Sequence, residues 1–171
     1  MTARLMSLLV AAVMMVASSA SADTSFGWTA YIGEPGGDAF NFSCGSVPLT
    51  SMNVRSGSTP NGVRVIDAVK GVCWNGSVSP WYGGTNGSSY WLQCPYDHAI
   101  RGLNSYGGWY VNGLQAFCEE MGGTHTATTG WVGSKSGTYK ALRCSGGQAA
   151  KAIRGGAGVF VDRLAIYCNF Y

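Results

Sequence analysis

The sequence predicts an all-β domain built from three equivalent units, because its cysteines, glycines and alternating apolar residues all recur. The first cysteine of each unit recurs every fifty residues, at Cys44, Cys94 and Cys144. Glycines recur upstream at the same interval, beginning with Gly33 and Gly37. A repeat of short alternating segments separated by glycine-rich turns indicates strands. Two folds with threefold repetition fit this pattern, the β-prism and the β-trefoil.

The N-terminal segment has the features of a secretory signal peptide. Arg4 gives a positive start, residues 5–16 form an apolar run, and the small residues 20–22 form a cleavage site. The apolar run is too short to span a membrane. The sequence therefore predicts that residues 1–22 are removed and that the protein is secreted, or periplasmic if the source is a bacterium.

Four strands are expected in each unit. The last strand of each unit alternates most clearly, because every second residue after an Asp or Asn is mostly apolar. These last strands cover residues 67–73, 112–118 and 162–168. A second strand of each unit precedes the first cysteine and covers residues 39–44, 90–94 and 139–144. A third covers residues 49–54, 99–103 and 149–153. A fourth, shorter strand covers residues 29–32, 81–82 and 131–132. The aromatic residues that recur with the units are expected in the core: Trp28, Tyr31, Trp81, Trp131 and Tyr139.

No linker divides the chain after the signal peptide. Residues 23–171 are expected to form a single domain, with repeats at about 23–73, 74–118 and 119–171. Residues 56–62 are an insertion that lengthens the first repeat. Residues 120–130 have the composition of a loop between the second and third repeats.

The cysteines indicate disulfide bonds. An even number in an exported chain favours disulfides over metal ligands or catalytic thiols, but six cysteines allow fifteen connectivities. The repeat favours one bridge in each unit: Cys44–Cys73, Cys94–Cys118 and Cys144–Cys168. No Cys-x-x-Cys motif occurs and the chain has two histidines, so no metal and no other cofactor is expected.

Charge and catalytic motifs exclude several function classes. Eleven basic residues against eight acidic ones are too small an excess to indicate a nucleic-acid partner. Neither histidine lies in a nucleophile motif, so no catalytic triad is expected. Glu119 and Glu120 are adjacent and would point to opposite faces of a strand, which argues against a glycosidase pair. The sequence therefore predicts a binding protein and not an enzyme.

One motif resembles a known family. Gly158-Val-Phe-Val-Asp162, leading into an alternating strand, resembles the sugar-binding loop of jacalin-type lectins. The segments 33–40 and 83–90 resemble the glycine-rich first loop of that family. The repeat from Trp131 onward, with its paired cysteines, is also similar to the vitelline membrane outer layer proteins. Both resemblances imply a β-prism of three four-stranded antiparallel sheets, and the Gln-x-Trp signature of trefoils is absent.

The resemblance to jacalin-type lectins implies a carbohydrate site and glycan partners. A carboxylate accepts strong hydrogen bonds from sugar hydroxyls, glycine lets the backbone approach closely, and an aromatic ring covers an apolar sugar face. Carried over by motif, the site consists of Gly36, Gly37, Gly158, Val159, Phe160 and Asp162. No metal is required for this kind of binding.

Two weaker sites are implied in the other repeats. One would contain Gly108, Trp109, Tyr110 and Asn112, and the other Asp67, Gly83 and Gly84. A structural interpretation stays open, because Asp and Asn side chains often hydrogen-bond backbone amides at turns. The alternative functions are accordingly a disulfide-stabilised extracellular coat protein, or a protein-binding module without sugar specificity.

Overall fold

The computed structural model describes residues 27–171, so the expected signal peptide lies outside the described residues. Every regular element from Gly27 to the C-terminus is a β-strand, and there are fourteen of them. No helix in this part of the chain is long and apolar enough to cross a membrane.

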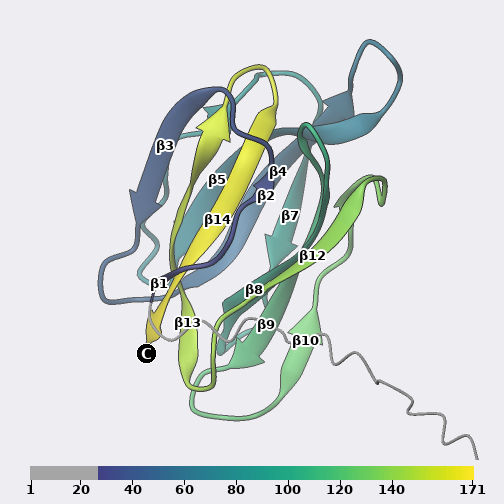
Figure 1. Cartoon of the computed structure of the whole chain (residues 1–171). Helices are drawn as coiled ribbons and strands as arrows, with labels where there is room; N and C mark the ends of the chain where they lie inside the picture. Colours follow the sequence, from purple (N-terminus) through teal and green to yellow (C-terminus); the bar gives the residue numbers. More distant parts are fainter. Residues whose placement is uncertain (1–26) are drawn as a thin grey trace, which may run out of the picture.

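Three antiparallel sheets make up the molecule (Figure 1). Sheet A contains β1 (Gly27–Trp28), β2 (Ile32–Gly33), β3 (Asp38–Ser43), β13 (Gln148–Ala157) and β14 (Val161–Phe170). Sheet B contains β4 (Leu49–Ser58), β5 (Arg64–Cys73), β6 (Tyr82–Gly83) and β7 (Ser88–Gln93). Sheet C contains β8 (His98–Gly107), β9 (Val111–Glu120), β10 (Thr126–Thr128), β11 (Val132–Gly133) and β12 (Thr138–Arg143). This architecture is the expected β-prism and not the trefoil. Sheets A and C have five strands because their outer strand is broken into two pieces.

The three sheets do not coincide with the three sequence repeats. In sheet A, β3 from the first repeat pairs with β13 from the third, with Phe40 opposite Gly155. In the same way β7 pairs with β4, and β12 pairs with β8. Each sheet therefore combines strands from neighbouring repeats, and the N-terminal strands close the prism against the C-terminal ones.

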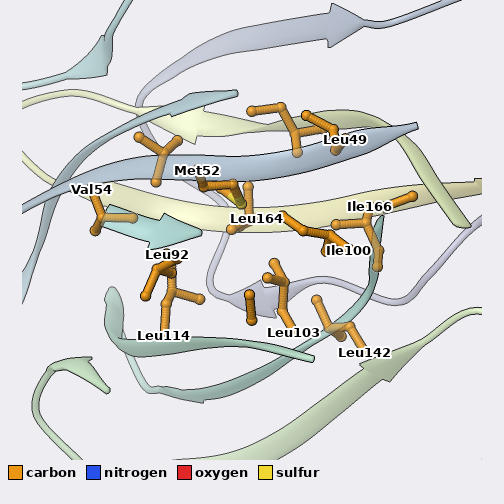
Figure 2. Close-up of a cluster of buried hydrophobic side chains, with 14 of the residues drawn as sticks. Leu49, Met52, Val54, Leu92, Ile100, Leu103, Leu114, Leu142, Leu164 and Ile166 are labelled. Carbon is orange, nitrogen blue, oxygen red and sulfur yellow. The ribbon is translucent and has the colours of Figure 1, made fainter. Parts of the chain in front are cut away.

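The core lies where the inner faces of the three sheets meet. Figure 2 shows the large aliphatic side chains that fill it, among them Leu49, Leu103 and Leu164. On β14, Leu164 and Ile166 are buried, while Arg163 and Tyr167 on the other face are partly exposed, as the period of a strand requires. Full burial of one such side chain contributes about 2 kcal/mol of hydrophobic stabilisation.

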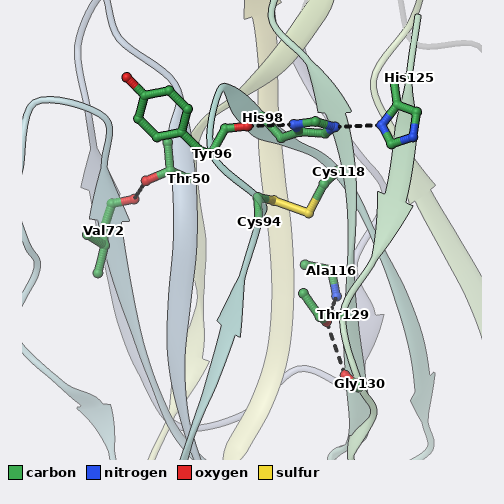
Figure 3. Close-up of a disulfide and its surroundings, with 10 residues drawn as sticks. All are labelled: Thr50, Val72, Cys94, Tyr96, His98, Ala116, Cys118, His125, Thr129 and Gly130. Carbon is green, nitrogen blue, oxygen red and sulfur yellow. Dashed lines mark hydrogen bonds between the residues drawn. A yellow bond between two sulfur atoms is a disulfide. The ribbon is translucent and has the colours of Figure 1, made fainter.

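The disulfide pairing expected from the repeat is confirmed, and each bridge joins two sheets. Cys44 follows β3 of sheet A and bonds to Cys73 on β5 of sheet B. The second bridge joins Cys94, after β7 of sheet B, to Cys118 on β9 of sheet C (Figure 3). The third joins sheet C to sheet A through Cys144 and Cys168. The three bonds together connect all three pairs of sheets.

Several details differ from the sequence-based expectations. The two long strands of each sheet run for ten residues, because the glycine-rich segments at their ends continue the pairing. The stretch 120–130 is not all loop, since Thr126–Thr128 forms β10 against β9. The recurring aromatic residues lie outside the buried core. Trp28, Trp81 and Trp131 instead pack on the outer faces against Arg or Lys side chains, where a ring shields the aliphatic stem and attracts the cation.

Candidate functional site

A β-bulge positions the acidic or amide side chain near the start of each C-terminal long strand. In sheet A, Gly156 pairs with Arg163 and Ala157 with Val161, so Asp162 is the extra residue. The same shift leaves Asn112 unpaired between β8 and β9, and Asp67 unpaired between β4 and β5. A bulge redirects the side chain that it contains, and here it turns all three toward glycine-rich loops.

Asp162 lies against the glycine loop between β2 and β3. A Cβ atom added to Gly36 would lie 2.6 Å from Asp162 Oδ1, and one added to Gly37 would lie 2.5 Å from Oδ2. Gly37 also has a φ of +63°, which other residues avoid. Only glycine at these two positions lets the loop approach the carboxylate this closely. The structure thus brings together Gly36, Gly37 and Asp162, as the motif predicted.

The environment of Asp162 keeps its carboxylate oriented and partly dehydrated. Partial burial raises the pKa of Asp162 above the ordinary value for aspartate. Hydrogen bonds from the backbone N–H groups of Gly158 and of Asp162 itself oppose this effect and favour the charged form. The backbone donors thus favour the charged carboxylate, which is the form that accepts strong hydrogen bonds from a hydroxyl-bearing ligand.

A cleft of about 740 Å³ opens beside Asp162. Four loops line it, with these residues: Glu34, Pro35, Thr59, Pro60, Asn61, Val63, Val65, Gly108, Trp109, Tyr110, Asn112, Phe160 and Asp162. In Figure 1 the β13–β14 turn and the β4–β5 hairpin project from the end of the prism opposite the C-terminus. Residues that the sequence assigned to two sites, around Asp162 and around Asn112, therefore line one cleft.

Aromatic rings form one wall of this cleft. The side chain of Trp109 is 82 % exposed, as expected for a loop residue, and the rings of Tyr110 and Phe160 lie 5.0 Å apart in an edge contact. Val159 is exposed at the tip of the β13–β14 turn and is not part of the cleft lining. The arrangement places a carboxylate and apolar ring surfaces at one opening, which suits a ligand with both hydroxyl groups and an apolar face.

Sequence reasoning missed one side of the cleft. The insertion at residues 56–62 extends β4 through Ser58 and then supplies Thr59, Pro60 and Asn61 to the lining. Glu34 and Pro35, between the recurring glycines, also line it. The position of the insertion could have indicated this part of the cleft, because the insertion lies in the first repeat's equivalent of the Gly158–Asp162 loop.

Asn112 makes hydrogen bonds within its own sheet. Its Nδ2 donates to the backbone oxygen of Ser136 at 3.0 Å and to Ser136 Oγ at 3.3 Å. The amide thus ties the start of β9 to the loop between β11 and β12, which is the structural role that the sequence left open. Its donor group is occupied, although the residue still borders the cleft.

Asp67 is enclosed by its surroundings. Its relative exposure is 1 %, and Oδ2 is buried without a hydrogen-bond partner. Burial raises the pKa of this carboxyl. Gly84 contacts Asp67 through the backbone, with its N–H donating to the Asp67 carbonyl at 2.9 Å. A Cβ atom on Gly83 would lie 2.1 Å from that same carbonyl oxygen, so the predicted third group is assembled around backbone atoms.

No family model matches the sequence, and no curated protein sequence matches it. Solved structures do match its shape. Wild-type Malaysian banana lectin superposes with a TM-score of 0.67 at 18 % identity, covering 86 % of this chain and 100 % of that one. A mannose-binding jacalin-related lectin from Ananas comosus gives a TM-score of 0.67 at 20 % identity, covering 84 % and 97 % of the two chains.

The chain has the jacalin-related lectin fold. Artocarpin, solved as a mannotriose complex, adds a TM-score of 0.69 at 15 % identity over 86 % of this chain and 99 % of its own. Because these structures cover nearly their whole length, the match is to a complete jacalin-related fold and not to a shared sheet. At such identities the likeness concerns the backbone, and the chemistry of the site depends on this chain's own residues.

Proposed function

We propose that the protein is a secreted lectin that binds carbohydrate non-covalently in the cleft beside Asp162. The observation that carries the proposal is the close packing of the Asp162 carboxylate against Gly36 and Gly37 at the rim of that cleft. The carboxylate would accept hydrogen bonds from two sugar hydroxyls, and the glycine loop would leave room for the sugar to reach it.

The aromatic wall supports the same ligand class. A pyranose has one face of C–H groups, and Phe160 or Trp109 offers a ring surface to cover it. The solved structures that share the fold include proteins described as mannose-binding and one bound to mannotriose. We infer sugar binding for this chain by combining that likeness with the geometry around Asp162.

The three predicted sites would differ in their contact with the sugar. Asp162 is the principal ligand group, because its carboxylate borders open space. Asn112 and Trp109 would contribute to the wall of the same cleft and not to a separate site. Asp67 would not contact sugar, because its carboxylate is enclosed. The signal peptide expected at residues 1–22 and the three disulfides support secretion.

The test is a glycan array with the oxidised protein and its Asp162→Asn variant. We expect the wild type to bind a defined set of neutral glycans, and the variant to bind them at least about tenfold more weakly, because a charge-assisted hydrogen bond is lost. Asp97→Asn is the matched control. It removes the same charge from an exposed turn between β7 and β8, and asparagine tolerates the φ of +60° there.

Equal binding by the wild type and Asp162→Asn would place the sugar elsewhere. Absence of glycan binding by the folded, oxidised protein would favour the second candidate, a structural protein of an extracellular coat. The hydrogen bonds of Asn112 to Ser136 favour that second role, since they show one of the three repeated polar residues acting within the fold.

A further inference from the structure

The outer face of sheet A carries two arginines in adjacent positions. The register places Arg154 on β13 opposite Ala165 on β14. Arg163 lies opposite Gly156, so the two arginines are diagonal neighbours on one face of the sheet. This face points away from the core.

Aromatic rings hold both guanidinium groups. Arg154 Cζ lies 4.2 Å from the centroid of the Trp28 ring and 5.1 Å from that of Tyr31. Arg163 Cζ lies 4.8 Å from the same Tyr31 centroid. Stacking on a ring restricts the rotamers of an arginine, so less entropy is lost when the group then binds a ligand.

Neither arginine has an anionic partner within residues 27–171. The Nε atom of each is buried without a hydrogen bond, and neither side chain forms an ion pair. The terminal nitrogens are not among the buried atoms without partners, so these donors face the surface. The two side chains therefore present paired N–H groups that the fold itself does not use.

Three cationic side chains gather around Tyr31. Because they share the Tyr31 ring, the two Cζ atoms lie no more than about 10 Å apart, which is within one Debye length at 0.1 M salt. Lys140 adds a third cation, with Nζ donating to the backbone oxygen of Tyr31 at 3.0 Å. A bound anion would relieve the repulsion between these groups.

Sheet B offers an internal comparison. On the outer face of sheet B, Arg55 lies opposite Ala68 and stacks on Trp81 at 4.2 Å. Its Nη1 donates to the backbone oxygen of Gly84 at 3.3 Å. A stacked arginine of sheet B therefore has an internal acceptor, whereas Arg154 and Arg163 of sheet A have none among the described residues, so stacking alone does not account for the open donors.

We propose that Arg154 and Arg163 form a site for an oxyanion, namely a sulfate or carboxylate group of an acidic polysaccharide. The planar guanidinium fork matches two oxygens of such a group, and two adjacent forks add charge from both sides. A Cβ atom added to Gly156 would lie 2.0 Å from the Gly36 oxygen and 3.5 Å from Arg163 Nε, so the site borders the glycine loop.

The experiment measures the affinity of the oxidised protein for three polysaccharides by biolayer interferometry. The probes are chondroitin 4-sulfate, unsulfated chondroitin and neutral dextran. We expect the protein to bind chondroitin 4-sulfate, and this binding should weaken with added salt. Neutral dextran should not bind at the arginine site. If the protein also binds unsulfated chondroitin, the carboxylate groups of the polysaccharide are sufficient for binding at this site. Failure to bind either charged polymer would overturn the proposal.

Variants separate a specific site from general attraction to polyanions. Arg154→Gln and Arg163→Gln should each weaken binding of the charged probe about tenfold, whereas Arg55→Gln should leave it unchanged. Arg163→Lys keeps the charge but loses the fork, and should also weaken binding. Equal losses for Arg55→Gln and Arg154→Gln, or equal affinity for duplex DNA, would show non-specific attraction and overturn the proposal.

Asp162→Asn distinguishes this inference from the proposed lectin function. This variant should bind chondroitin 4-sulfate with wild-type affinity, whereas its binding of neutral glycans should be lost. Circular dichroism confirms that each variant is folded. If Arg154→Gln fails to fold, Arg154→Lys tests the same fork with the stem retained, and unchanged affinity in that variant would count against the site.

Discussion

At the scale of single residues, three side chains in equivalent bulges have three different surroundings. Asp162 borders the cleft, the amide of Asn112 donates to Ser136, and Asp67 is buried with one oxygen unpartnered. The identity of the residue matters less than what surrounds its oxygen atoms. Only a carboxylate with accessible lone pairs can accept hydrogen bonds from a ligand.

Replacing Asp67 with Asn should stabilise the protein. The buried carboxylate lacks a partner for Oδ2, and burial penalises its charge. Asn112 shows that an amide fits the equivalent position and donates to the adjoining loop. We expect the free energy of unfolding at neutral pH to rise by about 1 kcal/mol, measured by urea denaturation.

The stabilisation should depend on pH in a defined direction. Because burial raises the pKa of Asp67, the folded state binds its proton more tightly than the unfolded state does. The wild type therefore gains stability as the pH falls through the raised pKa toward the ordinary value of 3.8, and no further below it. The advantage of Asp67→Asn should be lost at about pH 3. An equal difference at both pH values would show that charge is not the cause.

At the scale of elements, the glycine loop between β2 and β3 matters because it must pass close to β14. The long strands on each side of the bulge set where the carboxylate emerges, and the loop sets what surrounds it. Without this loop, the strand would leave the Asp162 side chain in solvent. The glycine loop packs against the bulge, and the carboxylate of Asp162 is therefore partly buried.

Gly37→Ala should abolish ligand binding, and Gly45→Ala provides its matched control. The two glycines have nearly the same φ, +63° and +66°. An added Cβ on Gly37 would lie 2.5 Å from Asp162 Oδ2, whereas one on Gly45 would meet no atom within 4 Å. Both variants should lose about 1–2 kcal/mol of unfolding free energy, because alanine is strained at a left-handed φ. Thermal or urea denaturation measures this loss.

Steric contact should cost Gly37→Ala more than Gly45→Ala and should displace the carboxylate of Asp162. We therefore expect glycan binding to be lost in the first variant and kept in the second. Equal stability losses together with retained binding in both variants would mean that the loop can move away from Asp162 without harm.

At the scale of the whole molecule, stability depends on holding three sheets around one core. Each disulfide joins a different pair of sheets, and β3 closes the prism by pairing with β13. The cysteines lie toward one end of the long strands, while the bulges that contain Asp67, Asn112 and Asp162 lie at the other. On β9, for example, Asn112 is near the start and Cys118 near the end.

Removing the bond between sheets B and C should lower stability without removing the ligand site. In the chain-entropy model, opening the Cys94–Cys118 loop with two alanine substitutions should cost about 3 kcal/mol. We expect this loss in guanidinium denaturation, with glycan affinity unchanged at temperatures where the variant is folded. A loss of affinity in the folded variant would show that this disulfide also positions the cleft.

Local patterns in the sequence predicted much of the fold. The fifty-residue interval predicted three units, alternation around Leu164 and Ile166 predicted strands, and the repeat favoured the disulfide pairing now observed. The ends of the long strands were less predictable, because their glycine-rich segments resemble turns. Thr126–Thr128 was missed for a related reason, since its pairing with β9 is not visible in a polar segment.

By itself, the sequence determined the number of units, the kind of element and the position of Asp162 next to a tight turn, because those depend on neighbours in the chain. Only the tertiary structure decided that the 59–63 hairpin and the Trp109 loop share a cleft with Asp162, that Asp67 is enclosed, and that Arg154 and Arg163 meet over Tyr31. Those results depend on strand pairing between distant segments and on burial, and neither is a property of a local pattern.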